Sequence, residues 1–261
     1  MFWQTDLTLL FVLIVIAFVA ALELGFRLGI RFRPSADADP ERTHIASIQA
    51  SALGLLALLL GFTFAMAVSR SDERRVLVLE EANAIGTAVL RAQLLPVPYN
   101  QTAATYLKSH VDARLAFFEA GIDPVRLNAA EQRAATTEAQ LWSVARDAVA
   151  ADTKSIPIGL FVEALNAVID VHEKRRVAFY NHVPEAALYL LVVVSMAALA
   201  VTSYGGGLIR RRHFWSNLTL AVLIAIVLAA ILDIDRPRRG LIQVNQDSLV
   251  RLKASFSDEK K

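Results

Sequence analysis

Four stretches of the chain are apolar over nearly the length that a membrane-spanning helix needs. They cover residues 7–28, 46–68, 184–204 and 215–232, and each approaches the roughly 20 residues that cross a bilayer as a helix. Elsewhere apolar residues recur at every third or fourth position, as in Phe161, Leu165 and Val168, and no alternating strand pattern of useful length occurs. This spacing is typical of amphipathic helices, so we expect an all-α protein.

The second apolar stretch runs directly into a charged segment without a strong helix breaker. Residues 46–95 contain no proline, and the segment SRSDERR at 69–75 lies in the middle of this range. Only Gly54, Gly61 and Gly86 weaken the helical pattern, and each costs about 1 kcal/mol relative to alanine inside a helix. We therefore expect one continuous helix, on the order of 75 Å long. Because the hydrocarbon core is only about 30 Å thick, this helix would couple a membrane span mechanically to a soluble domain.

The region between the second and third apolar stretches has the features of a helical bundle. Asn100 is a candidate N-cap for a helix that ends before Gly121, a residue suited to the left-handed conformation at a helix C-terminus. Asn128 is a candidate N-cap for the next helix, and Pro157 suits the first turn of a third. That third helix leads through Pro184 into the third apolar stretch.

These assignments divide the chain into four parts. Residues 1–68 hold the first two transmembrane helices, residues 69–183 form a helical extramembrane domain, residues 184–235 hold the last two transmembrane helices, and residues 236–261 form a C-terminal tail. The predicted fold is four spanning helices with a helical bundle between the second and third, into which the helices of spans two and three continue. The lipid bilayer is therefore an expected partner.

The composition agrees with a protein that is part membrane and part soluble, because 55% of the 261 residues are hydrophobic and 20% are charged. The formal net charge of +2 is small, and the basic residues do not gather with aromatic residues on one face. This argues against nucleic-acid binding. The chain has no cysteine, which excludes disulfides, thiolate metal sites and thiol nucleophiles.

Sequence signatures of enzymes are missing. The chain has no HExxH motif, no GxSxG motif and no glycine-rich phosphate loop, and its histidines are isolated along the sequence. His172, with Asp170 and Glu173 nearby, is the only hint of a metal ligand, but adjacent residues of a helix point in different directions. We therefore expect no enzyme activity, no cofactor and no metal site.

The second apolar stretch permits two interpretations. Its small and polar residues, including Gly54 and Gly61, favour close helix packing in lipid. Alternatively, its bulky residues recur at helical spacing and form a narrow apolar gate, because such constrictions close channels by dewetting. The candidates for this gate are Leu55, Leu58, Leu59, Phe62 and Met66.

Charged residues gather where the second and fourth apolar stretches end. The segment after the second stretch contains Arg70, Arg74, Arg75, Glu80, Glu81 and Asn83, and the end of the fourth contains Asp233, Asp235 and Arg236. The simplest interpretation is an ion-pair collar that joins the two segments, because opposite charges at one membrane interface attract each other. The alternative is a vestibule that binds a small ion.

Glu23 and Arg27 form a further charged pair near the end of the first stretch. Their spacing of one helical turn puts them on the same helix face. One interpretation is a satisfied interfacial pair, and the other is a pore-lining or ion-coordinating role, since ionisable groups at membrane depth are costly. The glycines at 205–207 and the arginines at 210–212 are interpreted as the turn between the last two spans.

Three segments of the sequence together resemble the bestrophin-like domain family of bacterial membrane proteins. They are ELG in the first stretch, GFTFAMAVSRSDERRVLVLEEANAIGTAVLRAQLLP from the second stretch onward, and LDIDRPRRGLIQV after the fourth. The resemblance covers nearly the whole chain and implies four spanning helices that flank a helical domain. It also implies a likeness to bestrophins, which are oligomeric, chloride-permeable channels with a pore lined by the second span. The acidic calcium cluster of bestrophins has no recognisable counterpart here.

The residues and the resemblance lead to one hypothesis and one alternative. The hypothesis is a homo-oligomeric anion channel in a bacterial inner membrane, which conducts small inorganic ions such as chloride along the second span. In it, Arg70, Arg74, Arg75 and the arginines after Asp235 form a positive vestibule. The alternative is a non-conducting scaffold or sensor whose helical domain binds a partner.

Overall fold

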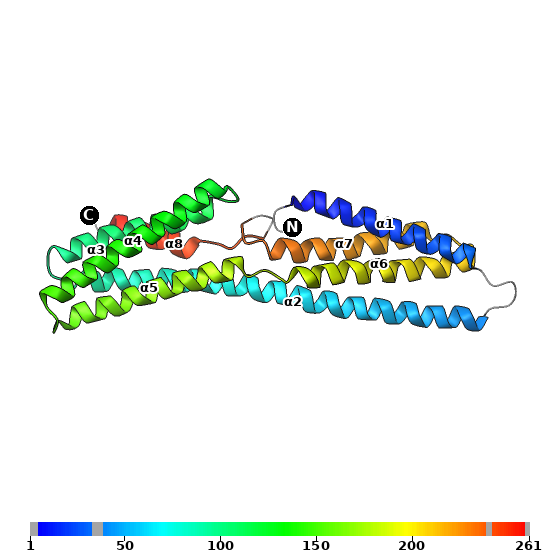
Figure 1. The fold of residues 1–261 in the computed structure, drawn as a ribbon, viewed down its shortest axis with the longest axis horizontal. Coiled ribbons are helices and arrows are strands. Elements are labelled where there is room, and N and C mark those ends of the chain that lie inside the picture. The colour runs from blue at the N-terminus through cyan, green and yellow to red at the C-terminus, as the bar shows by residue number, and fades with distance from the viewer. Residues whose placement is uncertain (1–4, 33–38, 239–241, 259–261) are drawn as a thin grey trace. The chain divides into compact units, whose positions relative to one another are not determined.

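All secondary structure in the described part of the chain is helical. The computed structural model describes residues 5–32, 39–238 and 242–258. Within these ranges the helices are α1 (Leu7–Arg31), α2 (Asp39–Ala92), α3 (Tyr99–Glu119), α4 (Pro124–Ala151), α5 (Ile156–Tyr180), α6 (Glu185–Leu208), α7 (Phe214–Ile234) and α8 (Asp247–Asp258), and no strand occurs (Figure 1). The prediction of an all-α fold is confirmed.

The chain divides into two compact units. Met1–Ser69 and His182–Arg236 form one, which we call the membrane unit, and Arg70–Asn181 and Pro237–Lys261 form the other, the extramembrane unit. The membrane unit contains α1, the first part of α2, α6 and α7, and the extramembrane unit contains the remaining helices. Each of the four predicted spans lies in a helical stretch long and apolar enough to cross a membrane.

Helix α2 is uninterrupted where the chain passes from one unit to the other. It contains 54 residues, and both Ser69 and Arg70 lie within it. Neither Gly54 nor Gly61 breaks it, because the cost of a single glycine is small beside the hydrogen bonds of the surrounding turns. The prediction of one continuous helix is confirmed.

The third span does not continue as a helix into the extramembrane domain, so this prediction is wrong. Helix α5 ends at Tyr180 and α6 begins at Glu185, and the residues between them are not helical. Pro184 explains the break, because proline has no N–H to donate to the preceding turn and its ring disfavours a helical conformation at Val183.

In the membrane unit, α1 packs closely against α6. A Cβ atom at Gly25 would lie 2.1 Å from the carbonyl oxygen of Ala200, so only glycine permits this approach. Helix α7 packs against both α1 and α6. The buried side chains of this core include Phe18, Leu56, Leu191, Leu199 and Leu228.

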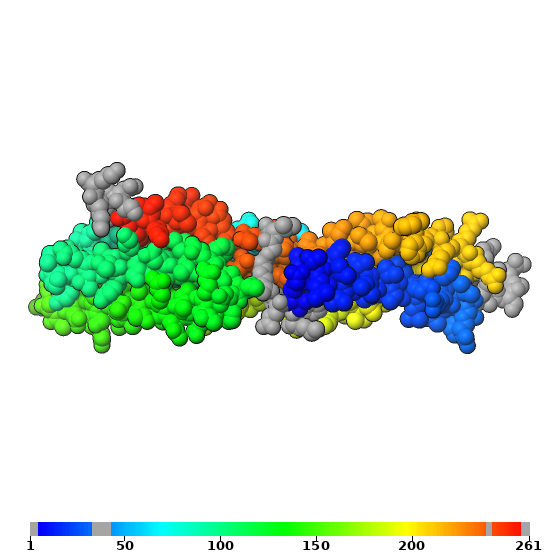
Figure 2. Space-filling view, turned by 90° about the horizontal axis from the view of Figure 1, so that it is seen from above, coloured from blue at the N-terminus to red at the C-terminus, as the bar shows by residue number. Residues whose placement is uncertain are grey.

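The extramembrane unit is a bundle with its own core. The second part of α2, α3, α4, α5 and α8 surround fully buried side chains that include Ile85, Leu107, Leu141, Phe161 and Leu165. Helix α8 contributes the buried Leu249 and lies against α3, as Figure 2 shows for the red and blue-green surfaces. The predicted C-terminal tail therefore contains a helix that completes this core.

Two predicted helix starts are wrong. Helix α3 begins at Tyr99, so Asn100 lies inside its first turn. Helix α4 begins at Pro124, and the carboxylate of Asp123 accepts hydrogen bonds from the free N–H groups of its first turn. Aspartate caps a helix as well as asparagine does, and Asn128 therefore lies inside α4.

Two other local signals are confirmed. Gly121 follows Ala120, the C-cap residue of α3, and has a φ of 58°, the left-handed conformation that glycine adopts without strain. Pro157 lies in the first turn of α5, where its missing N–H costs no hydrogen bond.

Candidate functional site

One face of α2 is exposed in the membrane unit and contains most of the predicted gate residues. Leu55, Leu58 and Phe62 expose 52%, 54% and 64% of their surface, and Met66 exposes 41%. Residues three, four and seven apart lie along one side of a helix, so these side chains form a stripe. Leu59 is half-buried and packs against the membrane core. The described residues of one chain therefore leave this stripe uncovered.

The glycines of the stripe differ from those of α1. A Cβ atom at Gly54 or Gly61 would meet no atom within 4 Å. By contrast, a Cβ atom at Gly29 would lie 2.3 Å from the carbonyl oxygen of Tyr204. The chain uses the small size of the α1 glycines for its own packing, whereas the space beside Gly54 and Gly61 is filled by no described residue.

In the extramembrane unit, the exposed residues of α2 include acidic and polar side chains as well as the apolar Val76, Leu79 and Leu90. Glu73, Glu80 and Asn83 are exposed, and their spacing puts them on one side of the helix. Arg75 is exposed as well, and it lies 3.9 Å from the carboxylate of Asp72.

Arg70 and Arg74 point towards the C-terminal end of α5. Arg74 is 5% exposed, and it donates from Nε to the carbonyl oxygen of Ala178 at 3.0 Å and from Nη2 to that of Asn181 at 2.9 Å. Arg70 donates to the side-chain oxygen of Asn181. Carbonyl groups at a helix C-terminus lack partners within the helix and attract positive charge, so Arg74 caps α5, whereas Arg70 contacts the side chain of the residue that follows the helix.

The charged residues at the end of α7 are buried inside the membrane unit. Asp233, Asp235 and Arg236 are 5%, 0% and 4% exposed. The carboxylate of Asp235 accepts a hydrogen bond from the backbone N–H of Val183 at 2.7 Å and lies 3.4 Å from Nδ1 of His182. Asp235 therefore ties the segment before α6 to the end of α7.

The later arginines of the predicted vestibule belong to the extramembrane unit. The guanidinium of Arg238 lies 4.6 Å and 4.0 Å from the ring centroids of Phe117 and Phe179, and Nη1 donates to the carbonyl oxygen of Phe117 at 3.1 Å. Burial lowers the pKa of Arg238 to about 10. Arg239 lies outside the described residues.

Glu23, at the other end of the membrane unit, is shared by two arginines. Arg27 donates from Nε to Oε1 of Glu23 at 2.8 Å, and Arg212 forms an ion pair with Oε2. The pair that the sequence indicates therefore supplies two members of a three-residue cluster, whose third member comes from the turn between α6 and α7.

Glu81 is fully buried in the extramembrane unit and binds two arginines. Arg114 donates from Nε to Oε1 of Glu81 at 2.7 Å, and Arg175 forms an ion pair with Oε2. Burial by itself raises the pKa of Glu81, but the two guanidinium groups outweigh this effect and lower it to about 2. Arg175 also donates to the side-chain oxygen of Gln246 at 2.9 Å. The neighbouring Glu80 is exposed instead.

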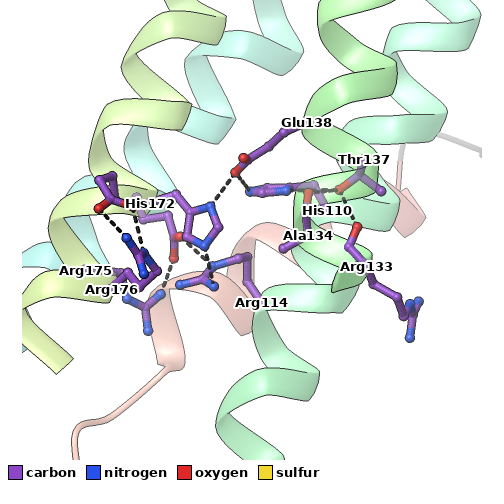
Figure 3. A network of polar contacts seen from close by, with 11 residues as sticks. His110, Arg114, Arg133, Ala134, Thr137, Glu138, His172, Arg175 and Arg176 are labelled. Atoms are coloured by element: carbon purple, nitrogen blue, oxygen red, sulfur yellow. Dashed lines mark hydrogen bonds and ion pairs between the residues drawn. The ribbon is translucent and has the colours of Figure 1, made fainter. Parts of the chain in front are cut away.

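His172 and Glu138 extend this buried network (Figure 3). Arg114 donates from Nη1 to Nε2 of His172, across 3.0 Å. The other ring nitrogen, Nδ1, is hydrogen-bonded to Glu138. Because a guanidinium group has donors only, Nε2 of His172 accepts the hydrogen bond from Arg114, and Nδ1 is the ring nitrogen that donates to Glu138.

His110 lies next to His172, with ring centroids 5.8 Å apart. Its Nδ1 atom is 3.2 Å from the hydroxyl of Thr137, which itself donates to the carbonyl oxygen of Ala134 at 2.8 Å, so the hydroxyl accepts from His110. Nε2 of His110 has no hydrogen-bond partner among the described residues and lies 3.9 Å from Glu138. Burial lowers the pKa of His110 to about 4, so the ring is neutral at pH 7.

A small cavity of about 30 Å³ adjoins the network. One water molecule needs about 10–15 Å³ on this measure, so the cavity admits about two. Its walls include Arg74, Arg114, Phe117, His172, Arg175 and Phe179. In the part of the chain that the structure describes, no three or more His, Asp or Glu side chains are arranged to hold a metal ion.

Sequence reasoning missed Arg114 and Glu138, treated His110 as isolated, and connected His172 only with its neighbours Asp170 and Glu173. One signal was present, because His110 and Arg114 lie four residues apart on the apolar face of α3 that contains Leu107. Ionisable residues on an apolar face are buried, and buried charges are nearly always paired. Their partners could not be named, since they lie 27 to 58 residues away along the chain.

The model of the Bestrophin-like domain family matches residues 16–249. This match includes most of the chain, and the chain therefore belongs to that family. No protein of curated function matches it.

Solved structures of similar fold include a bacterial bestrophin homolog from Klebsiella pneumoniae. One crystal structure of it has a TM-score of 0.65 and 16% sequence identity, and the match covers 97% of this chain and 98% of that one. Two structures of single-residue variants of the homolog have TM-scores of 0.65 and 0.67 at 16% identity, covering 94% and 98% of this chain and 98% and 99% of theirs. At this identity the likeness concerns the fold.

Proposed function

We propose that this member of the bestrophin-like family assembles into a homo-oligomeric ion channel in a bacterial inner membrane, with α2 lining the conducting path. The observation that supports this most is the uncovered stripe of α2. Bulky apolar side chains at Leu55, Phe62 and Met66 recur there at helical spacing and are exposed. Brought together by several copies around an axis, such side chains form an apolar constriction that closes by dewetting.

Oligomerisation is part of the proposal. The four spans of one chain are too few both to enclose a conducting path and to present a surface to the lipid. Several copies around a rotation axis enclose such a path between them. The open space beside Gly54 and Gly61 supports this, because small residues on a span permit close approach of another helix.

The charged side chains on the exposed face of α2 favour cations over the chloride preference that the resemblance implied, because the exposed Arg75 lies beside Asp72. Arg70 and Arg74 are engaged with the end of α5, whereas Glu73 and Glu80 are exposed on α2. Rings of carboxylates are typical of cation-selective paths. We therefore infer cation selectivity for a path lined by this helix.

Planar bilayers containing the purified protein test the proposal. With a KCl gradient across the bilayer, we expect currents that reverse near the potassium equilibrium potential. Currents that reverse near the chloride equilibrium potential would support the proposal of a channel but overturn the inferred selectivity for cations. A protein that stays silent across voltage, pH and calcium concentration would instead favour the scaffold or sensor alternative.

A further inference from the structure

A cavity opens at the end of the membrane unit where the turn between α6 and α7 meets α1. Its volume is about 130 Å³. Since about 10–15 Å³ suffices for one water on this measure, it has room for a polar group larger than a single water. Its lining includes Glu23, Phe26, Arg211, Arg212, His213 and Asn217.

The backbone of the turn places two arginines beside α1. Helix α6 ends at Leu208, and Arg210 adopts a φ of 51°. The N–H of Arg211 then donates to the carbonyl oxygen of Gly206 at 3.1 Å, which folds the chain back over the end of α6. Gly29 and Gly207 hold α1 close at this point, because a Cβ atom at Gly207 would lie 2.9 Å from the Cα atom of Gly29.

Arg212 is held in a defined orientation but remains accessible. Its guanidinium lies 5.3 Å from the ring centroid of Phe26 and 5.5 Å from that of Phe214, and it forms an ion pair with Glu23. Its side chain is nevertheless 53% exposed. Two aromatic contacts and one carboxylate therefore fix the guanidinium at the wall of an open cavity.

The charge of the cavity is positive. Arg211 and Arg212 line it, and Arg27 shares Glu23 with Arg212. Three arginines against one carboxylate leave two positive charges in excess among these four side chains. An anionic group is therefore the ligand that the electrostatics favour.

The cavity also lies where a lipid headgroup would be. It is at the ends of three apolar helices, α1, α6 and α7. Trp215, in the first turn of α7, is 77% exposed. Tryptophan is enriched at the level of the headgroups, and basic pockets between spanning helices bind anionic headgroups.

We propose that this cavity binds the phosphodiester headgroup of an anionic phospholipid, with Arg211 and Arg212 as its principal contacts. Glu23 competes with the lipid for Arg212, so that on binding a phosphate oxygen replaces the Glu23 carboxylate as the partner of Arg212. This inference is independent of whether the protein conducts ions.

Native mass spectrometry of the full chain in detergent tests the proposal, with phosphatidylglycerol or phosphatidylcholine added at equal concentration. We expect the natural protein to retain more phosphatidylglycerol than phosphatidylcholine. In an Arg211→Gln/Arg212→Gln variant, the ratio of retained phosphatidylglycerol to phosphatidylcholine should be about five times smaller. The matched control is Arg210→Gln, which removes a charge from the same turn at a position that does not line the cavity. Equal loss in this control would overturn the proposal, since it would show attraction by net charge alone.

A second variant distinguishes lost binding from lost folding. Glu23→Gln removes the competing carboxylate, and we expect it to increase the retention of phosphatidylglycerol. A decrease would overturn the proposed competition and with it the site. Displacement of the lipid by equimolar inorganic phosphate would also overturn the proposal, because the cavity would then be a site for soluble anions.

Discussion

Arg114 donates a hydrogen bond to Nε2 of His172 across 3.0 Å, and this contact determines which ring nitrogen accepts and which donates. A guanidinium group cannot accept a hydrogen bond, so the second nitrogen of His172 is the donor and faces Glu138. The same arginine binds Glu81 through Nε. One side chain of α3 thus joins an acid from α2 to a histidine from α5, which places Arg114 at the centre of the extramembrane unit.

The first prediction concerns the acid of this network. Glu81→Gln removes the carboxylate that Arg114 and Arg175 share inside the unit, and breaking a buried ion pair from one side costs about 3–5 kcal/mol. We expect a loss of this size in the free energy of unfolding, measured by denaturation of the whole protein in detergent. Glu80→Gln is the matched control, because Glu80 is exposed and a substitution there changes stability by about 0.5 kcal/mol or less. Equal effects of the two variants would contradict the role assigned to Glu81.

The second prediction concerns pH. Burial lowers the pKa of His110 to about 4 in the folded protein. In the unfolded chain the pKa of this histidine has its ordinary value of about 6.5. Between these values the unfolded state takes up a proton that the folded state does not, so stability is full above pH 6.5 and falls as pH decreases. We expect His110 to account for a loss of about 3 kcal/mol at pH 4.

Thermal unfolding of the natural protein and of His110→Gln between pH 7 and pH 4 measures this contribution. The variant has no titrating group at this position, so its stability should depend less on pH. Parallel pH profiles would show that His110 is protonated in the folded state or is not the responsible group.

The third prediction compares two glycines of the membrane unit. Gly25→Ala would force a methyl group against the carbonyl oxygen of Ala200, and overpacking of this kind costs about 1–3 kcal/mol or more. Gly54→Ala meets open space within the chain and should leave the protomer at least as stable, since alanine favours helix by about 1 kcal/mol. If another copy packs against Gly54 in the proposed assembly, Gly54→Ala should also weaken the association between copies.

Thermal unfolding and size-exclusion chromatography with light scattering separate these two effects. Gly25→Ala should lower the unfolding temperature. Gly54→Ala should lower the oligomer mass without lowering the stability of the protomer. An unchanged mass would remove Gly54 from the contact between copies.

The fourth prediction concerns the gate. Phe62 is the most exposed of the five gate candidates on α2, with 64% of its surface exposed. Phe62→Ala removes bulk from an apolar constriction and lowers the cost of wetting it, so single-channel current or open probability should rise in planar bilayers. Leu13→Ala is the control, because Leu13 is similarly exposed on α1. An equal change in the control would argue against a gate on α2.

The fifth prediction concerns selectivity. Glu73→Gln/Glu80→Gln removes two exposed carboxylates from α2, and it should move the reversal potential towards that of chloride. Glu119→Gln, at the exposed end of α3, removes an acidic charge elsewhere in the same unit. If both variants shift the potential alike, the effect comes from the total charge of the unit and α2 does not line the path.

Several features of this protein follow from local sequence alone. The four spans were predictable because a bilayer demands a long apolar run, and such a run is visible in any window of the chain. The continuity of α2 was predictable for a similar reason, since the absence of proline over residues 46–95 is itself local. Helix ends were less certain, because Asp123 and Asn128 are both good caps and tertiary contacts select between them.

The charged site was decided by tertiary structure. Glu80 and Glu81 are adjacent and chemically identical, yet only Glu81 faces α3 and α5, where it meets Arg114 and Arg175. The same holds for Glu23, whose helical spacing revealed Arg27 but whose second partner, Arg212, is 189 residues away. A sequence determines which side chains share a helix face, because that depends on the rotation per residue. Which face meets which helix depends on the packing of the whole unit, and this alone selects the partner of each buried charge.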